Sequence, residues 1–345
     1  MKRAVLAIVL VTTACTQTTD NPAKPADCAK ASAHDFDGDG RDDVAIGDPW
    51  VAGGAVRLLT AGKVVKLPSP ELGAHDGFGA ALTFAKVDGD GCADLVVGAP
   101  YADVGGKEAG AVYILYGGAA RPPQRITARQ PKDGATFGWS LAAHGDVIAI
   151  GAPHENAVHL ARRGTVERTI TQDTMGVPGD SDPLDQFGTE VALGPMASGK
   201  VALAVGAPYE GEVGAVTVID DVNADRLSGA MLTPPKIDDG GLCEFGQSLV
   251  HIEGVGLAVG GADCGKVQFY DLDLHPSRTV ARPRNAPKFE PVRLASTNGQ
   301  AAALWPGPSP TLRLLGKGDL KASETARSVT FLDGEPITMR ADVLS

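Results

Sequence analysis

A short apolar run that ends in Gly-Ala-Pro or a close variant recurs five times along this chain, and this repeat limits the folds open to it. The copies are residues 44–49, 95–100, 148–153, 203–208 and 257–262, and their glycines are 51, 53, 55 and 54 residues apart. A second phrase, Phe-Gly, precedes four of the copies by 14 to 20 residues, at Phe78, Phe137, Phe187 and Phe245. Units of this length are typical of the blades of a β-propeller.

Each repeat unit is predicted to be a small antiparallel sheet of about four strands. Its order is a strand that carries Phe-Gly, a tight turn, a strand that ends in Gly-Ala-Pro, and an outer strand such as 111–116, 215–219 or 266–270. The chain has 44 glycines, 24 prolines and no long stretch of helical period, so we expect an all-β fold. Because one blade cannot bury both of its faces, stability is expected to come from the packing of blades around a closed ring.

The combination of Phe-Gly, an aspartate-rich loop and Gly-Ala-Pro resembles the FG-GAP repeat, known from the integrin α-subunit propeller and from many exported bacterial proteins. The resemblance is clear over residues 34–270. Beyond them, Asn298-Gly299 and Asp333-Gly334 have the composition of hairpin turns and indicate two degenerate blades. The resemblance therefore implies an all-β domain over residues 34–345, a β-propeller of seven blades. Six blades are the alternative, because the last unit is short.

The strongest chemical signal is the loop formed by residues 35–43. Aspartates stand at its positions 1, 3, 5 and 9, namely Asp35, Asp37, Asp39 and Asp43, and the backbone carbonyl of Arg41 is available at position 7. Calcium takes six to eight oxygen ligands, so this pattern predicts a Ca²⁺ site. An EF-hand would need a glutamate at position 12, where this chain has Ile46, so the FG-GAP form of the loop fits better. The alternative is a solvated acidic turn, in which the carboxylates would repel one another.

A second loop, residues 86–94, keeps three of the four carboxylates, in Asp88, Asp90 and Asp94. Lys86 takes its first position, so a second calcium site is in doubt, and the lysine ammonium is an alternative to the metal. The corresponding loops of later repeats are too short in acidic residues to hold calcium. The ions are expected to brace the structure and to take no part in chemistry.

The N-terminus resembles a bacterial export signal. Lys2 and Arg3 precede an apolar stretch over 4–11 that is too short to span a bilayer, which predicts a signal peptide over 1–14. Ala14-Cys15 resembles the lipobox, although Thr12 stands where that motif prefers leucine, and it predicts a lipid on Cys15 followed by a flexible spacer over 15–33. We therefore expect a protein anchored to the cell membrane on its extracytoplasmic side. An ordinary signal peptide and a secreted product are the alternative.

The charge balance limits the partners. Without the first 14 residues, which hold two of the 31 basic residues and none of the 42 acidic ones, the formal net charge falls from −11 to −13. Such an acidic chain is not expected to bind nucleic acid or an anionic lipid surface. It is compatible with binding cations.

Four cysteines remain after Cys15, and an even number in an exported protein predicts disulfides. Cys243 and Cys264 flank a predicted hairpin with a two-residue turn, Glu253-Gly254, which would place them opposite each other. Cys28 would then pair with Cys92. Pairing between molecules is the alternative.

No catalytic constellation is recognisable in the sequence. Residues 260–266 have the glycine and lysine spacing of a phosphate-binding loop, but Val267 and a predicted strand follow where that motif needs Ser or Thr and a helix. His154 and His159 are five residues apart, one more than the zinc-protease motif requires.

The sequence therefore predicts an interaction module for a protein or glycan at the cell envelope. The loops 101–110 and 209–214 are the candidate surface, at the end opposite the calcium loops. Tyr101 and Tyr209 are candidate anchors there, but each follows the proline of its phrase, and packing between blades is the role that we favour for them. A propeller hydrolase or lyase acting on polysaccharide or lipid is the alternative function, and it would need paired carboxylates near the central axis.

Overall fold

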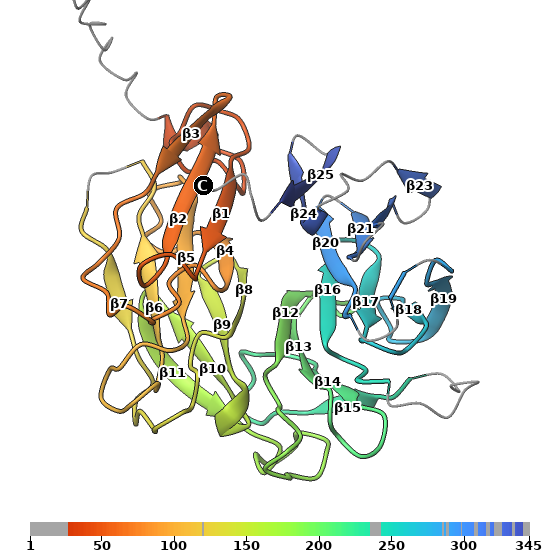
Figure 1. Ribbon diagram of the computed structural model, residues 1–345. Helices are drawn as coiled ribbons and strands as arrows, with labels where there is room; N and C mark the ends of the chain where they lie inside the picture. Colours follow the sequence, from red (N-terminus) through yellow and green to blue (C-terminus); the bar gives the residue numbers. More distant parts are fainter. Residues whose placement is uncertain are drawn as a thin grey trace, which may run out of the picture.

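Over the residues that it describes, the computed structural model is a ring of antiparallel sheets with almost no helix (Figure 1). The structure describes residues 27–118, 121–234, 243–284, 286–287, 290–297, 299–306, 310–314, 318–320, 326–332 and 335–340. The predicted signal peptide, Cys15, most of the spacer, Asn298 and the Asp333-Gly334 turn lie outside these residues. No helix within them has the length and apolar character that crossing a membrane requires.

Within this described part, seven sheets follow one another along the chain, and each is built from consecutive strands. The first has three strands, β1 (Val44–Asp48), β2 (Ala55–Thr60) and β3 (Lys63–Lys66). The next two sheets have four strands each: β4 (Leu82–Ala85), β5 (Asp94–Ala99), β6 (Ala111–Leu115) and β7 (Gln124–Ile126), then β8 (Ser140–His144), β9 (Val147–Ala152), β10 (Ala157–Arg162) and β11 (Thr165–Ile170). Two short 3-10 helices accompany them, η1 (Cys28–Lys30) and η2 (Pro153–Glu155).

The second half of the ring repeats the arrangement. Its four-stranded sheets are β12 (Glu190–Pro195), β13 (Val201–Ala207), β14 (Ala215–Ile219) and β15 (Gly229–Leu232); β16 (Ser248–Ile252), β17 (Gly256–Gly260), β18 (Lys266–Tyr270) and β19 (Pro276–Ala281); and β20 (Arg293–Thr297), β21 (Gln300–Trp305), β22 (Thr311–Leu314) and β23 (Gly318–Leu320). The last sheet is the two-stranded hairpin β24 (Ala326–Leu332) and β25 (Glu335–Arg340).

The sheets are arranged in chain order around a central axis (Figure 1). The inner strands β4, β8, β12, β16, β20 and β24 contact one another in that order, and β1 touches both β4 and β24. The prediction of an all-β propeller is confirmed. Six sheets of three or four strands form six blades, which was the alternative blade number, and the hairpin β24–β25 lies between the sixth blade and the first.

The hydrophobic core lies between blades and not within them. Phe78, Phe137, Phe187 and Phe245 are fully or almost fully buried, and the clusters around them combine residues of neighbouring sheets. The prediction that Phe-Gly belongs to a strand was wrong, because the inner strands start three or four residues later. Phe78, for example, forms an isolated bridge with Gly54 of the preceding blade. Phe-Gly thus joins one blade to the next.

The two repeated phrases meet across each blade boundary. A Cβ atom on Gly98 of the Gly-Ala-Pro phrase would lie 2.1 Å from the carbonyl oxygen of Gly138, the Phe-Gly glycine of the next blade. The same close approach is found between Gly47 and Gly79, Gly151 and Gly188, and Gly206 and Gly246. Any side chain there would push the blades apart, so the packing of the ring requires glycine at these positions.

Candidate functional site

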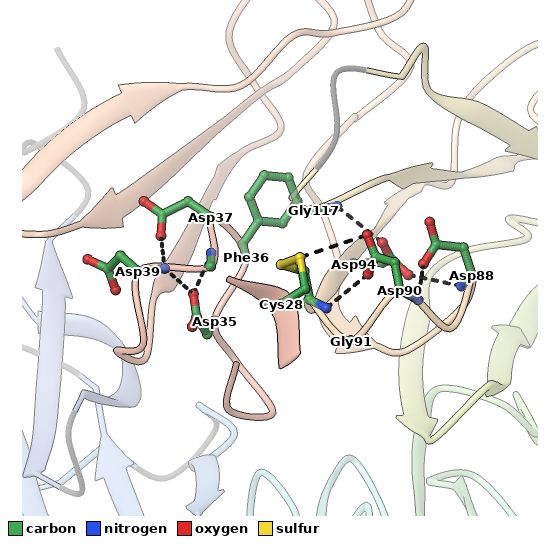
Figure 2. Close-up of a disulfide and its surroundings, with 12 residues drawn as sticks. Cys28, Asp35, Phe36, Asp37, Asp39, Asp88, Asp90, Gly91, Asp94 and Gly117 are labelled. Atoms are coloured by element: carbon green, nitrogen blue, oxygen red, sulfur yellow. Dashed lines mark hydrogen bonds between the residues drawn. A yellow bond between two sulfur atoms is a disulfide. The ribbon is translucent and has the colours of Figure 1, made fainter. Parts of the chain in front are cut away.

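The first aspartate loop, residues 35–43, is folded around its own carboxylates (Figure 2). Asp35 Oδ1 accepts hydrogen bonds from the amides of Gly38 at 2.7 Å and Asp39 at 3.2 Å, and Asp35 Oδ2 accepts one from Gly40 at 2.8 Å. Asp37 Oδ1 accepts a bond from the Asp39 amide at 3.1 Å. These bonds tighten the turn and keep the aspartates close together.

Three of the predicted ligands converge. Carboxylate oxygens of Asp35, Asp37 and Asp39 lie within 4.8 Å of one another, and Asp35 is fully buried. Ionised carboxylates at this separation repel one another unless a cation lies between them. Each carboxylate has about four acceptor positions, so the amide hydrogen bonds leave some of them open.

Asp43 supplies the most specific sign that the loop fits a cation. Its side chain is 3 % exposed, and its Oδ2 accepts hydrogen bonds from the amides of Phe36 at 2.9 Å and Asp37 at 3.4 Å. Its Oδ1 is buried without a hydrogen-bond partner. Burial raises the pKa of Asp43 to about 6, against the opposing effects of the neighbouring Thr60 hydroxyl and the Phe36 amide, and the Asp37 carboxylate acts in the same direction as burial. A bound cation would satisfy the orphaned oxygen and remove this cost.

The second loop, residues 86–94, repeats the hydrogen bonds of the first. Asp94 Oδ2 accepts bonds from the amides of Val87 at 2.7 Å and Asp88 at 3.3 Å, just as Asp43 Oδ2 does from Phe36 and Asp37. In contrast to Asp43, both carboxylate oxygens of Asp94 are bonded, since Oδ1 accepts a hydrogen bond from the Gly117 amide at 3.1 Å.

Two cationic side chains accompany the second loop. Lys86 Nζ donates hydrogen bonds to the carbonyl oxygens of Gly91 and, at 2.8 Å, of Ser32. Arg121 Nη1 forms an ion pair with Asp88 Oδ2 at 2.7 Å. The carboxylates predicted as the doubtful second site therefore already have positive charge beside them.

A disulfide ties the segment that precedes the first loop to the second loop (Figure 2). The predicted pairing of Cys28 with Cys92 is confirmed, with their Cα atoms 4.4 Å apart. The amide of Ala93 also donates to the Asp35 carbonyl oxygen at 2.8 Å, and that of Asp27 donates to the Gly38 carbonyl oxygen at 3.0 Å. Residues 27–33, which the sequence assigns to the spacer, thus lie against the loops.

The second predicted disulfide, Cys243–Cys264, is also confirmed, with a Cα separation of 4.3 Å. The register that was used to predict it was wrong by one residue. Ile252 pairs with Gly256, so the turn between β16 and β17 has three residues instead of two. Both cysteines lie outside these strands, and the bridge joins the segments that flank them.

Aromatic side chains gather at the end of the blades that lies opposite the aspartate loops. The residue after the proline of the repeated phrase is aromatic or histidine in four successive blades: Trp50, Tyr101, His154 and Tyr209. Ring centroids are 6.2 Å apart for Trp50 and Tyr101, 6.3 Å for Tyr101 and Trp139, and 6.1 Å for Trp139 and His154. Tyr101 and Tyr209 were candidate anchors from the sequence, whereas Trp50 and Trp139 were not. The shared repeat position was the signal that could have found Trp50.

A pocket of about 490 Å³ lies beside these rings, at the axis of the ring of blades. We call it the axial pocket; its lining comes from five blades and comprises Pro49, Trp50, Ala80, Ala81, Leu82, Pro100, Tyr101, Trp139, Ser140, Leu141, Thr189, Glu190 and Arg293. Burial raises the pKa of Glu190 to about 8, against the opposing effect of the nearby Arg293 guanidinium. Sequence reasoning did not find Glu190 or Arg293, because neither belongs to a repeated phrase.

Comparison with known families agrees with this architecture. Two family models of the FG-GAP repeat match the chain, one over residues 78–115 and the other over residues 123–166. The chain therefore contains FG-GAP repeats, as its Phe-Gly and Gly-Ala-Pro phrases predict. The first matched segment contains β4, β5 and β6 together with the second aspartate loop. The second contains β7, β8, β9 and β10.

The FG-GAP repeats are similar to segments of much longer proteins. Integrin alpha-PS2 of Drosophila melanogaster is 37 % identical over 141 residues, which is 35 % of this chain and 10 % of that protein. Integrin alpha-3 of Mus musculus is 33 % identical over 131 residues, covering 33 % of this chain and 12 % of that protein. Phosphatidylinositol-glycan-specific phospholipase D of Rattus norvegicus is 27 % identical over 210 residues, covering 54 % and 25 %. The FG-GAP chain thus spans at most a quarter of the length of these relatives.

Solved structures with low sequence identity share the fold. Virginiamycin B lyase from Staphylococcus aureus superposes with a TM-score of 0.59 at 11 % identity, covering 86 % of this chain and 88 % of that one. A streptogramin B lyase has a TM-score of 0.54 at 12 % identity, covering 82 % and 83 %. These similarities support the propeller architecture of the FG-GAP chain and nothing beyond it.

Proposed function

We propose that this FG-GAP propeller is a calcium-braced interaction module, anchored by a lipid on Cys15 to the extracytoplasmic side of a cell membrane. Its partner would be a protein or glycan of the cell envelope. The FG-GAP repeats and the two disulfides support the proposal. It is also supported by the position of the aspartate loops and the aromatic side chains at opposite ends of the same strands. The aspartate loops lie where β1 and β5 begin, and Trp50 and Tyr101 follow where these strands end.

Calcium would be held in the first loop. Carboxylate oxygens of Asp35, Asp37, Asp39 and Asp43 and the carbonyl oxygen of Arg41 are the candidate ligands. The buried, unpartnered Asp43 Oδ1 is the observation that carries this part of the proposal. A calcium ion there would neutralise the carboxylates and fix the loop against the second blade. It would supply no chemical step.

The second loop is proposed to need no ion. Lys86 donates to two carbonyl oxygens and Arg121 pairs with Asp88, so positive charge is already present beside Asp88, Asp90 and Asp94. A calcium ion would have to displace the Lys86 ammonium or bind next to it.

The interaction surface is proposed at the aromatic end. Trp50 is 78 % exposed and Tyr209 is 43 % exposed, and exposed aromatic side chains are common anchors in binding sites. The loops 101–110 and 209–214 surround this end. The acidic net charge of the chain argues against nucleic acid as the partner.

The alternative function, a hydrolase or lyase, has one supporting observation. Glu190 lies in the axial pocket with a pKa raised to about 8, as suits a general acid. Glycoside hydrolysis usually needs a second carboxylate within about 5–10 Å. Among the described residues that line the pocket, Glu190 is the only carboxylate. We therefore favour binding over catalysis.

Cross-linking on intact cells tests the proposed function. The tagged full-length chain is cross-linked at the cell surface, and captured partners are identified by mass spectrometry against a cytosolic bait. We expect an enriched envelope partner that is lost from the Asp37→Ala/Asp39→Ala variant. It should be retained by Asp271→Ala/Asp273→Ala, which removes another closely spaced aspartate pair. Capture of nothing above the control would contradict an interaction role.

The anchor is tested separately. Intact-mass analysis of the mature N-terminus should show an acylated Cys15, and a Cys15→Ser variant should leave the membrane fraction. An unmodified N-terminus at another residue, with the protein in the soluble fraction, would support a secreted product instead.

A further inference from the structure

We propose that the axial pocket binds a carbohydrate, with a sugar ring stacked on Trp139 or Trp50 and its hydroxyl groups bonded to Glu190 and Arg293. This inference rests on the proposed interaction role, whose partner class it names.

The aromatic rim of the pocket carries the first part of the argument. Trp50 is 78 % exposed and Trp139 is 38 % exposed, so both rings are accessible to a ligand at this end. Their rings are connected through Tyr101, with centroid separations of 6.2 and 6.3 Å, so the three rings form one continuous row beside the pocket. The face of an aromatic ring carries partial negative charge and attracts the C–H groups of a sugar ring.

The interior of the pocket is polar. Glu190 and Arg293 contribute a carboxyl and a guanidinium group to its lining, and the small side chains of Ala80 and Ala81 lie in the same lining. The hydroxyls of Ser140 and Thr189 already donate to the Gly188 and Gln186 carbonyl oxygens. Burial raises the pKa of Glu190, which favours the protonated carboxyl, and this form can both donate and accept hydrogen bonds. Arg293 adds several donors in a planar fork. This combination matches the hydroxyl groups at the edge of a sugar.

Other occupants fit less well. A protein epitope normally covers about 800 Å² on each partner and is broadly apolar at its centre, whereas this site is concave and mixed in polarity. Its volume of about 490 Å³ lies in the range of small-ligand pockets. An organic cation would be repelled by Arg293, and the rings lie against one another in a row instead of enclosing a common centre.

Tryptophan fluorescence offers a direct measurement. The chain has three tryptophans, of which Trp50 and Trp139 line the pocket and Trp305 is 3 % exposed in β21. The folded protein is first applied to a printed array of bacterial, plant and animal glycans, and each oligosaccharide that binds is then titrated in solution. We expect a saturable shift in tryptophan emission.

Variants locate the binding. Trp139→Ala or Trp50→Ala should weaken affinity by about tenfold, corresponding to loss of a stacking contact. Glu190→Gln keeps a donor and an acceptor and should retain binding, while Glu190→Ala should lose it. Leu184→Ala is the matched control, because Leu184 is 77 % exposed and does not line the pocket. Thermal unfolding of each variant confirms that it is folded.

The outcomes separate this inference from the proposed function. Absence of saturable binding to any glycan on the array, or unchanged affinity in both tryptophan variants, would overturn the carbohydrate assignment. Capture of a protein partner on cells, lost in Trp50→Ala and Trp139→Ala without any glycan binding, would also overturn it while leaving the interaction role intact. Failure of both capture and glycan binding would reject both.

Discussion

Lys86 occupies in the second aspartate loop the position that Asp35 occupies in the first. The ammonium of Lys86 donates to loop and spacer carbonyl oxygens, whereas the carboxylate of Asp35 accepts three amide hydrogen bonds. The remaining hydrogen bonds of the two loops correspond closely. The two loops therefore share their backbone hydrogen bonds but differ in charge at this position. From this difference we predict that the first loop binds a calcium ion and the second does not.

Replacing Lys86 should create a second calcium site. Lys86→Asp restores the fourth carboxylate of the loop beside Asp88, Asp90 and Asp94, so we expect the calcium stoichiometry to rise from one to two. Isothermal titration calorimetry of the metal-free protein measures it. Lys86→Ala, which removes the ammonium without adding a ligand, is the control. A wild-type protein that already binds two ions would show that Lys86 does not replace calcium.

Removal of calcium should destabilise the ring. An ion that binds only the folded state contributes about 2.7 kcal/mol to the free energy of unfolding at 100 times its Kd, so chelation should lower Tm. The Asp37→Ala/Asp39→Ala variant should unfold at the same temperature with and without calcium. Differential scanning calorimetry provides the measurement, and an identical Tm for wild-type protein in calcium and in chelator would contradict a bound ion.

Asp43 should make the calcium-free protein more stable at mildly acidic pH. Its pKa is about 6 in the folded state and 3.8 in the reference state, so between these values the folded protein binds more protons than the unfolded one. Stability contributed by this group therefore falls as pH rises from about 4 to 7, by up to ~3 kcal/mol. Urea unfolding of metal-free protein between pH 5 and 7.5 measures the slope. Asp43→Asn should flatten it, and an unchanged slope in this variant would exclude Asp43 as the cause.

The two disulfides should differ in their effect on calcium. Removing either bridge should cost about 2–4 kcal/mol of stability. Only Cys28→Ser/Cys92→Ser should also weaken calcium binding. Cys92 lies within the second loop, and Cys28 follows Asp27, whose amide donates to the Gly38 carbonyl oxygen of the first loop. Cys243→Ser/Cys264→Ser is the matched control. Equal calcium affinity in both double variants would show that the bridge does not position the first loop.

The close approach of glycines between blades is tested by one substitution. Gly98→Ala places a Cβ atom 2.1 Å from the Gly138 carbonyl oxygen, so we expect a loss of about 3 kcal/mol or more in the free energy of unfolding. Gly145→Ala is the control, because no atom lies within 4 Å of its Cβ position and only its positive φ of 62° is unfavourable, which costs about 1–2 kcal/mol. Similar losses in both variants would mean that blade contact does not require glycine at Gly98.

Much of the fold could be predicted because its repeat is local in the chain. The spacing of the Gly-Ala-Pro phrases predicted the blades, and the alternating aspartates of 35–43 predicted a loop whose carboxylates converge. The disulfide pairs were also predicted correctly, although the hairpin register behind one of them was wrong by a residue. A three-residue turn and a two-residue turn differ only in backbone conformation at residues 253–255, which composition does not distinguish.

The sequence by itself determined the type of blade, the position of the aspartate loops and the glycines that blade packing requires, since these belong to phrases that repeat along the chain. Tertiary structure decided what lies beside them. Lys86 reaches the Ser32 carbonyl oxygen 54 residues away, and Glu190 and Arg293 share a pocket with Trp50 only because the ring closes around its axis. Contacts across the ring join residues from different repeats, and no spacing within a repeat specifies which of their side chains will meet.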